Sequence, residues 1–228
     1  MNLFQCFLTK NDCYKAGKKI TPKGIMLHST GANNPYIKRY VQPNINGIGV
    51  NKYANDWNRS GVKVCVHAFI GKLDNGEIAT VQTLPWNHRG WHGGSGKKGS
   101  ANDSYIGFEI CEDALTDKSY FDKVYKEAVE LCAYLCKMYN LDPTKDGKII
   151  CHSEGYERGI SSNHGDVLHW FPKHGKSMDD FRNDVAKKLK PKTIYCVQVG
   201  AFSVKSNAEN LANELESKGY PTYIVEKQ

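Results

Sequence analysis

The sequence has no apolar run that could cross a bilayer. A membrane-spanning helix needs roughly 20 consecutive apolar residues, and no stretch of the 228-residue chain approaches that length. Residues 1–19 also lack the basic start, the long apolar segment and the small-residue cleavage site of a secretory signal. We therefore expect a protein that is synthesised in the cytoplasm without a signal peptide and has no membrane span.

The chain also lacks any Cys-x-x-Cys pair, although it contains eight cysteines. Several of them lie inside apolar segments, where small thiols are usually buried. Cys132 and Cys136 lie one helical turn apart, which indicates core positions and only secondarily a metal pair. Without a signal peptide, we expect these thiols to stay reduced.

Composition is that of an ordinary globular protein, with 40% hydrophobic and 24% charged residues. The net charge of +7 lies entirely in residues 1–190, because the remainder carries four lysines and four glutamates. A basic body favours a polyanionic partner, such as nucleic acid, a membrane surface or an anionic cell-wall polymer. The basic residues are scattered rather than clustered among aromatics, which argues against nucleic acid.

Strand-like and helix-like segments alternate over residues 1–190, which predicts an α/β fold with a mixed central β-sheet flanked by helices. The clearest helix is expected over 119–139, where apolar residues recur every three or four positions. Asp74-Asn75-Gly76 predicts a hairpin turn between two strands. The expected strands cover residues 24–28, 64–70, 77–83, 105–111 and 148–152, and a last helix follows its cap at Ser177.

Residues 191–193 form a short linker, and residues 194–228 a small C-terminal segment. A strand over 194–200, a helix over 206–218 and a strand over 220–225 predict a partial β-α-β module. Thirty-five residues are too few for an independent core.

The stretch 149–175 holds four of the eight histidines without a helical or strand period. Catalytic zinc sites use three protein ligands, usually imidazoles and carboxylates. His152 at one strand end, Asp166 in the following loop and His28 at a second strand end make a plausible site. A histidine at a strand end is more often structural, and His169 and His174 fit that simpler interpretation.

Two further features are typical of a functional site. Glu109 lies within a buried strand, where a carboxylate is costly unless it is paired or functional. Trp91 and His92 lie in a glycine-rich segment that suits a ligand groove better than a core.

Five segments in order resemble the type 2 N-acetylmuramoyl-L-alanine amidases, zinc enzymes that share the fold of peptidoglycan recognition proteins. The resemblance covers about residues 20–190, and the detail of residues 161–177 is similar to clostridial phage endolysins and their bacterial relatives. The segments are Ile25-Met26-Leu27-His28-Ser29-Thr30, Val66-His67-Ala68-Phe69-Ile70, Gly90-Trp91-His92-Gly93, Ile106-Gly107-Phe108-Glu109-Ile110 and Cys151-His152-Ser153-Glu154.

The resemblance implies one zinc ion per chain, held by His28, His152 and Asp166, with His164 or His169 as the alternative third ligand. It makes Glu109 the general base and His164, in place of the family's lysine, the group that stabilises the oxyanion. The bond cut would join N-acetylmuramic acid to L-alanine in peptidoglycan. The residues expected to contact substrate are His67, Trp91 and His92, with a purely structural role for His67 as the alternative.

The C-terminal segment resembles the start of a SPOR domain, a module that binds peptidoglycan. We expect it to target the chain to the wall or to self-associate with another copy. The enzyme, an endolysin or an autolysin, would then reach the cell wall after release from the cytoplasm. A non-catalytic peptidoglycan-binding module of the same fold is the main alternative, and the residues alone do not exclude another zinc hydrolase.

Overall fold

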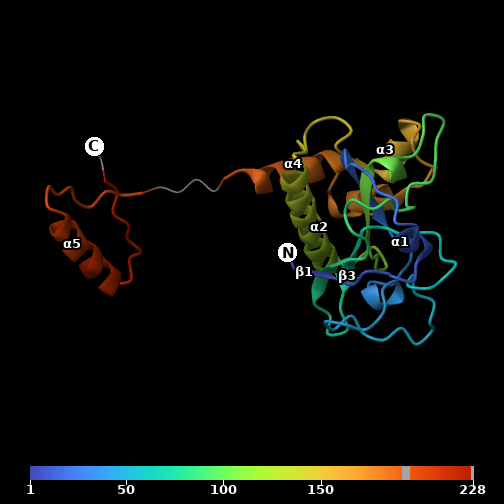
Figure 1. Ribbon diagram of the computed structural model, residues 1–228, viewed down its shortest axis with the longest axis horizontal. Coiled ribbons are helices and arrows are strands. Elements are labelled where there is room, and N and C mark those ends of the chain that lie inside the picture. Colours follow the sequence, from blue (N-terminus) through green and yellow to red (C-terminus); the bar gives the residue numbers. More distant parts are fainter. Residues whose placement is uncertain (192–195, 227–228) are drawn as a thin grey trace. The chain divides into compact units, whose positions relative to one another are not determined.

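The computed structural model describes residues 1–191 and 196–226 (Figure 1). The chain divides into two compact units, residues 1–190 and 191–228. Residues 192–195 and 227–228 lie outside the described part, so the expected linker and the start of the first C-terminal strand fall partly there.

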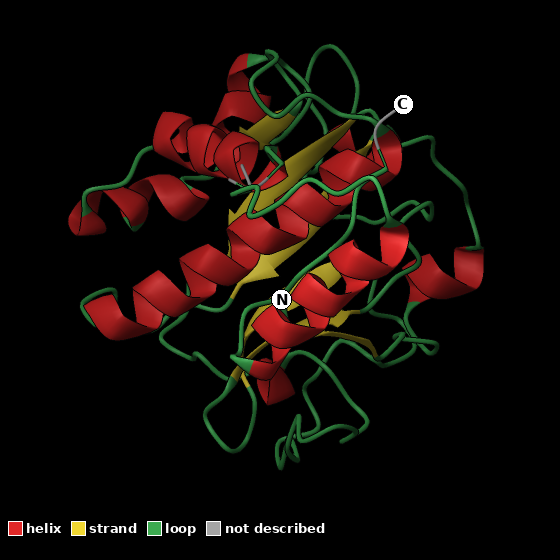
Figure 2. Cartoon of the chain, turned by 90° about the vertical axis from the view of Figure 1, so that its left-hand side faces the viewer, coloured by secondary structure: helices red, strands yellow, loops and turns green. Residues whose placement is uncertain are grey.

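A six-stranded sheet forms the centre of the first unit, with the strand order β1-β4-β3-β5-β2-β6. Figure 2 draws the strands in yellow and the helices in red. β3 and β4 pair in the antiparallel sense across the predicted hairpin turn, and all other neighbours pair in parallel, so the sheet is mixed as expected. The strands are β1 (Leu3–Gln5), β2 (Gly24–Ser29), β3 (Ala68–Lys72), β4 (Ile78–Gln82), β5 (Tyr105–Ile110) and β6 (Ile149–Cys151).

Helix α2 (Lys118–Tyr139) covers one face of this sheet and confirms the long helix predicted from periodicity. The side chain of Asp117 caps its start by accepting a hydrogen bond from the backbone N–H of Tyr120, at 3.0 Å. Asn140 ends it in the left-handed conformation that asparagine tolerates, with φ at 51°. Helix α4 (Met178–Leu189) packs against α2 and begins at the predicted cap, Ser177 (Figure 1).

Alternation along the strands divides the sheet into two chemically different faces. Ile25 and Leu27 of β2, with Phe108 of β5, pack into the core beneath α2. The residues that alternate with them along the strands, which include His28 and Glu109, therefore point to the opposite face. The candidate site consequently lies on the face that α2 does not cover.

Short helices and loops occupy the rest of the first unit. The predicted strand over 64–70 begins only at Ala68, and His152 opens a helix directly after β6. These helices are α1 (Asp12–Ala16), α3 (His152–Glu157) and the 3-10 turns η1 (Ile37–Arg39), η2 (Ala101–Asp103), η3 (Asp166–His169) and η4 (Phe171–His174).

The second unit contains the predicted helix, α5 (Lys205–Ser217). The two flanking strands were predicted wrongly for the part of the segment that the structure describes, residues 196–226, where no strand is assigned. Alternating apolar residues favour a strand only when a neighbouring strand takes up its backbone hydrogen bonds. Here Val197 and Val199 remain 87% and 63% exposed.

Among the described residues no helix is both long and apolar enough to span a membrane.

Candidate metal centre and active site

Three side chains from separate segments converge at one edge of the sheet. His28 lies at the end of β2, His152 follows the neighbouring parallel strand β6, and Asp166 begins η3. The Nδ1 atoms of His28 and His152 are 3.1 Å apart, and they lie 3.1 and 2.9 Å from Oδ2 of Asp166. The structure thus brings together the three residues that the sequence suggested as ligands.

The spacing of these three atoms suits a shared cation. A tetrahedral zinc ion with bonds near 2.0–2.1 Å holds neighbouring ligand atoms about 3.3 Å apart, close to the 2.9–3.1 Å found here. Two imidazoles and one carboxylate also match the donors that zinc prefers in catalytic sites. The residues present therefore fit a zinc ion.

The pKa values of His28 and Asp166 favour the protonation states that bind a metal ion. Burial lowers the pKa of His28, which keeps its ring neutral and leaves a nitrogen lone pair free. Burial opposes ionisation of Asp166, but hydrogen bonds with His152 and His28 outweigh it and hold the pKa of this carboxyl well below its usual range. A neutral imidazole and an ionised carboxylate are the forms that bind metal.

The backbone at Asp166 adopts an uncommon conformation. Its φ of 42° lies in the left-handed region, which costs free energy for a residue with a side chain, although aspartate tolerates it better than most. Such strained positions concentrate at functional sites, where the surrounding structure holds them. In this conformation Oδ2 of Asp166 lies 3.1 Å from Nδ1 of His28 and 2.9 Å from Nδ1 of His152.

Glu109 lies next to His28 in the parallel register of β2 and β5. Its Oε2 atom is buried and has no hydrogen-bond partner among the described residues. Burial, followed by the negative charges of Asp166 and Glu112, raises the pKa of Glu109 well above its ordinary value. An orphaned carboxyl with a raised pKa, beside a cluster of metal-binding groups, is a candidate for proton transfer.

His164 is exposed and lies beside the candidate ligand His152, with 4.6 Å between the ring centroids. Ser162 joins the two, because its hydroxyl lies 3.2 Å from Nε2 of His152 and 3.2 Å from Nδ1 of His164. Sequence reasoning missed Ser162, since a serine in a polar loop carries no periodic or motif signal.

His169 pairs with Glu112 rather than with the cluster, at 3.0 Å between Nε2 and Oε1. Glu112 is 3% exposed, and its pairing with His169 was not expected from the sequence. The group of converging ligand atoms contains neither His164 nor His169, the two alternative third ligands. His174 stacks on Phe121, with ring centroids 4.2 Å apart, in a structural role.

The three residues expected to contact substrate differ in exposure. Trp91 is 39% exposed, and the Arg89 guanidinium lies over its ring, 5.3 Å from the centroid. His67 is buried with both ring nitrogens bound to backbone: Nε2 donates to the His88 carbonyl at 2.7 Å, and Nδ1 accepts from the Gly107 N–H at 3.1 Å. Burial lowers the pKa of His67 to about 4, so this ring is neutral.

His92 lies deeper in the same region and contacts the cluster directly. Its Nδ1 is 2.9 Å from Nε2 of His28, and its Nε2 is 3.2 Å from the carbonyl oxygen of Tyr105. Burial, reinforced by the neighbouring His28, lowers the pKa of His92 well below its ordinary value. Direct substrate contact by His67 and His92 stays a prediction.

A comparison with protein families identifies the chain. Residues 18–166, well over half of it, match the family model described as N-acetylmuramoyl-L-alanine amidase. The chain belongs to the N-acetylmuramoyl-L-alanine amidase family. Residues 191–228 match the SPOR domain, as the sequence resemblance implied.

A curated relative of this amidase-family chain is the N-acetylmuramoyl-L-alanine amidase CwlH of Bacillus subtilis (strain 168). The two are 35% identical over 94 residues, a match that covers 36% of this chain and 36% of the relative. The matched part therefore spans about a third of the relative's length.

Solved structures show the same fold at lower identity. The Staphylococcus aureus hydrolase AmiA, solved in complex with its ligand, is 19% identical with a TM-score of 0.56, covering 83% of each chain. A mutant endolysin from Bacillus subtilis is 22% identical with a TM-score of 0.55, covering 81% of this chain and 99% of the other. These likenesses support the mixed α/β fold expected from the sequence.

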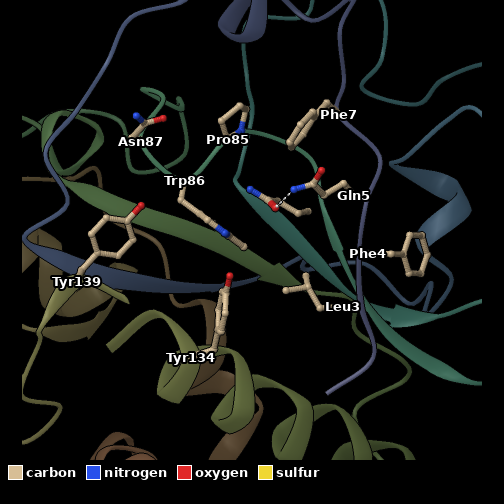
Figure 3. Close-up of a pocket in the computed structure, with 10 residues that line it drawn as sticks. Leu3, Phe4, Gln5, Phe7, Pro85, Trp86, Asn87, Tyr134 and Tyr139 are labelled. Atoms are coloured by element: carbon tan, nitrogen blue, oxygen red, sulfur yellow. Dashed lines mark hydrogen bonds between the residues drawn. The ribbon is translucent and has the colours of Figure 1, made fainter. Parts of the chain in front are cut away.

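A hollow of about 510 Å³ lies in the amidase unit, residues 1–190, away from the cluster of His28, His152 and Asp166 (Figure 3). It is formed around the ends of β1 and β4, which run antiparallel to the other four strands. It therefore lies at the opposite end of the sheet from the cluster of His28, His152 and Asp166. Its lining residues are Leu3, Phe4, Gln5, Phe7, Gln82, Pro85, Trp86, Asn87, Tyr134 and Tyr139. None of these lining residues is an acid, a histidine or a cysteine.

Proposed function

We propose that this chain is a zinc-dependent amidase that hydrolyses the bond between N-acetylmuramic acid and L-alanine in peptidoglycan. The observation that carries the proposal is the convergence of His28, His152 and Asp166 beside the orphaned carboxyl of Glu109, within a chain of this family. Degradation of the bacterial cell wall, by an endolysin or an autolysin, is the corresponding biological activity.

One zinc ion per chain would be held by Nδ1 of His28, Nδ1 of His152 and a carboxylate oxygen of Asp166. When bound, zinc polarises a carbonyl group and lowers the pKa of water toward neutrality. The protein's contribution is to keep the imidazole of His28 neutral and the carboxyl of Asp166 ionised.

Glu109 is the general base in this proposal. A carboxylate at Oε2 takes a proton from the attacking water, and the resulting carboxylic acid returns it to the nitrogen of the leaving L-alanine. Its present environment favours the protonated acid, because it is buried beside Asp166 and Glu112. A cation bound at the neighbouring cluster opposes that effect and favours the carboxylate that the base step needs.

His164 is assigned to the oxyanion that develops on the scissile carbonyl. Its ring is exposed, next to the ligand His152, and the hydroxyl of Ser162 lies close enough to orient its Nδ1. A donor placed where charge develops stabilises the transition state more than the ground state. The exposed ring of Trp91 is assigned to substrate binding, since aromatic faces pack against sugar rings and peptide groups.

The C-terminal segment is proposed to bind peptidoglycan, which its SPOR match supports. The chain would act on the cell wall after release from the cytoplasm. Self-association through this segment stays a prediction, which sedimentation of the full chain tests.

The test is hydrolysis of purified peptidoglycan, followed by the release of free L-alanine amino groups. Wild type should release them, lose the activity with a chelator and regain it with added zinc. Glu109→Gln should fall by at least about 100-fold, because general acid–base catalysis contributes roughly 10²–10⁴. New reducing sugars would point instead to a glycosidase, and zinc binding without any product would favour the non-catalytic binding module.

A further inference from the structure

His92 stands between the proposed ligand His28 and the backbone of β5. Its two ring nitrogens lie 2.9 Å from Nε2 of His28 and 3.2 Å from the Tyr105 carbonyl oxygen. We propose that His92 is a positioning residue of the metal site, which fixes His28 in the tautomer that binds metal through Nδ1. The inference rests on the proposed function only in taking His28 as a metal ligand.

The direction of these hydrogen bonds follows from the chemistry of the three groups. A backbone carbonyl can only accept, so Nε2 of His92 carries the proton and donates to Tyr105. A neutral imidazole has one donor and one acceptor, which leaves Nδ1 of His92 as the acceptor. His28 must then donate from Nε2, and its lone pair lies on Nδ1, the atom that faces His152 and Asp166.

His152, the second proposed ligand, is not held in one tautomer in this way. Nε2 of His152 faces the hydroxyl of Ser162, at 3.2 Å, and a hydroxyl can either donate or accept. This contact therefore permits both tautomers of His152. The two hydrogen bonds that run from His28 through His92 to the Tyr105 carbonyl fix the tautomer of His28 and not that of His152. Replacing His92 should therefore weaken metal binding more than replacing Ser162.

Two neighbouring residues hold the His92 ring in this position. A side-chain carbon built on Gly107 would lie 2.4 Å from the Cγ and Nδ1 atoms of the ring, so only glycine leaves room for it on β5. The buried side chain of Asn102 accepts hydrogen bonds from the N–H groups of His92 and Gly93, at 2.7 and 3.0 Å. Outer partners of metal-binding histidines set ring orientation and tautomer in this way.

The experiment compares the zinc affinity of full-length variants, measured by competition with a chromophoric chelator. His92→Phe keeps an aromatic ring but removes both hydrogen bonds, and should weaken zinc binding by about 10–100-fold. His92→Gln can still accept from His28 and donate to Tyr105, and should recover most of this loss. His174→Phe is the matched control, because His174 stacks on Phe121 away from the cluster, and should bind zinc as wild type does.

Two further measurements keep the test independent of folding defects in one variant. Gly107→Ala retains every histidine but displaces the His92 ring, and should also weaken zinc binding. In the metal-free wild type, two-bond ¹H–¹⁵N spectra should show His28 with its proton on Nε2, and His92→Phe should lose this preference.

Unchanged zinc affinity in His92→Phe, or a proton on Nδ1 of His28 in the metal-free wild type, would overturn the inference. These readouts do not depend on hydrolysis. A wild type that binds zinc but releases no L-alanine amino groups would contradict the proposed function and leave the role of His92 intact. Hydrolysis by wild type, together with unchanged zinc affinity in His92→Phe, would support the proposed function and overturn the role of His92.

Discussion

The amidase unit and the SPOR segment each match a known family, yet they differ sharply in packing. Residues 1–190 enclose a core of large side chains, in which Trp170 and Phe121 are no more than 1% exposed. In the described part of the C-terminal segment the apolar side chains that would form a core, such as Val197 and Val199, are mostly exposed. A match to a family therefore does not by itself mean that a segment buries a core.

The two regions also differ in the sequence separation of their ion-paired residues. In the amidase unit, Glu130 of α2 pairs with Lys188 of α4, which lies 58 residues away in the chain. In the described part of the C-terminal segment, the ion pairs join residues four apart along α5 and its C-cap, Lys205 with Glu209 and Lys218 with Glu214. Interactions that span the sequence stabilise a tertiary fold, whereas pairs within a helix add about 0.3–0.5 kcal/mol to that helix alone.

The largest effect should come from the three proposed metal ligands, which lie entirely in the amidase unit. Asp166→Asn removes the ligand charge but tolerates the positive φ of this position, so the backbone should be kept. We expect zinc affinity to fall by more than the roughly 10–100-fold that loss of an outer partner costs, with a parallel loss of hydrolysis. Chelator competition and product release from a soluble muropeptide measure the two effects.

The matched variant in the other region is Glu209→Gln, which changes an exposed acid of α5. It should leave both zinc affinity and hydrolysis of the soluble substrate unchanged. Equal losses in the two variants would show that the C-terminal segment contributes to the site, and the contrast between the regions would fail.

The sequence predicts the centre of the site better than its surroundings. His28 and His152 end neighbouring parallel strands, and Glu109 lies in register with His28, so strand order alone brings them together. Ser162 and Asn102 act through loop geometry and single hydrogen bonds, which leave no periodic trace in the sequence.

Prediction of the fold from the sequence was limited in the same way. The helix over 119–139 could be predicted because its apolar face repeats locally over many residues. The strands around α5 were predicted from a similar local pattern, but a strand depends on a distant partner that a local pattern does not contain. Whether such a segment forms a strand therefore depends on contacts with residues far away in the sequence.

A smaller effect should follow from truncating the core of the amidase unit. Phe121 packs against Trp170, Phe171 and His174. Phe121→Ala should cost about 3–5 kcal/mol of unfolding free energy, which lowers Tm by roughly 6–20 °C in a domain of this size. Calorimetry of the metal-free protein measures it.

Val199→Ala is the comparison in the C-terminal segment, and it should leave that transition where it is, because Val199 is largely exposed. A drop in Tm comparable to that of Phe121→Ala would mean that the segment unfolds together with the amidase unit. If Phe121→Ala fails to fold, Phe121→Leu provides a milder step in the same direction.

The smallest effect is the pH dependence of the ion pair between helices. Hydrogen bonds from Lys188 and then from the N-terminal amino group lower the pKa of Glu130 from 4.5 to about 2. A lowered pKa stabilises the folded state above the ordinary pKa, and this stabilisation is lost as the pH falls from about 4.5 toward 2. Glu130→Gln should therefore be less stable than wild type by about 1 kcal/mol or less at pH 7, since the pair is partly screened by solvent.

Denaturant unfolding at pH 7, 4 and 2 measures that difference, which should shrink toward zero at the lowest pH. The control is Glu214→Gln, whose partner Lys218 caps the C-terminal end of the same helix, and it should not shift the main transition at any pH. A difference for Glu130→Gln that stays constant with pH would mean that packing, and not charge, carries the effect. Long-range charge pairing would then no longer distinguish the amidase unit from the C-terminal segment, and burial of the core alone would account for their contrast.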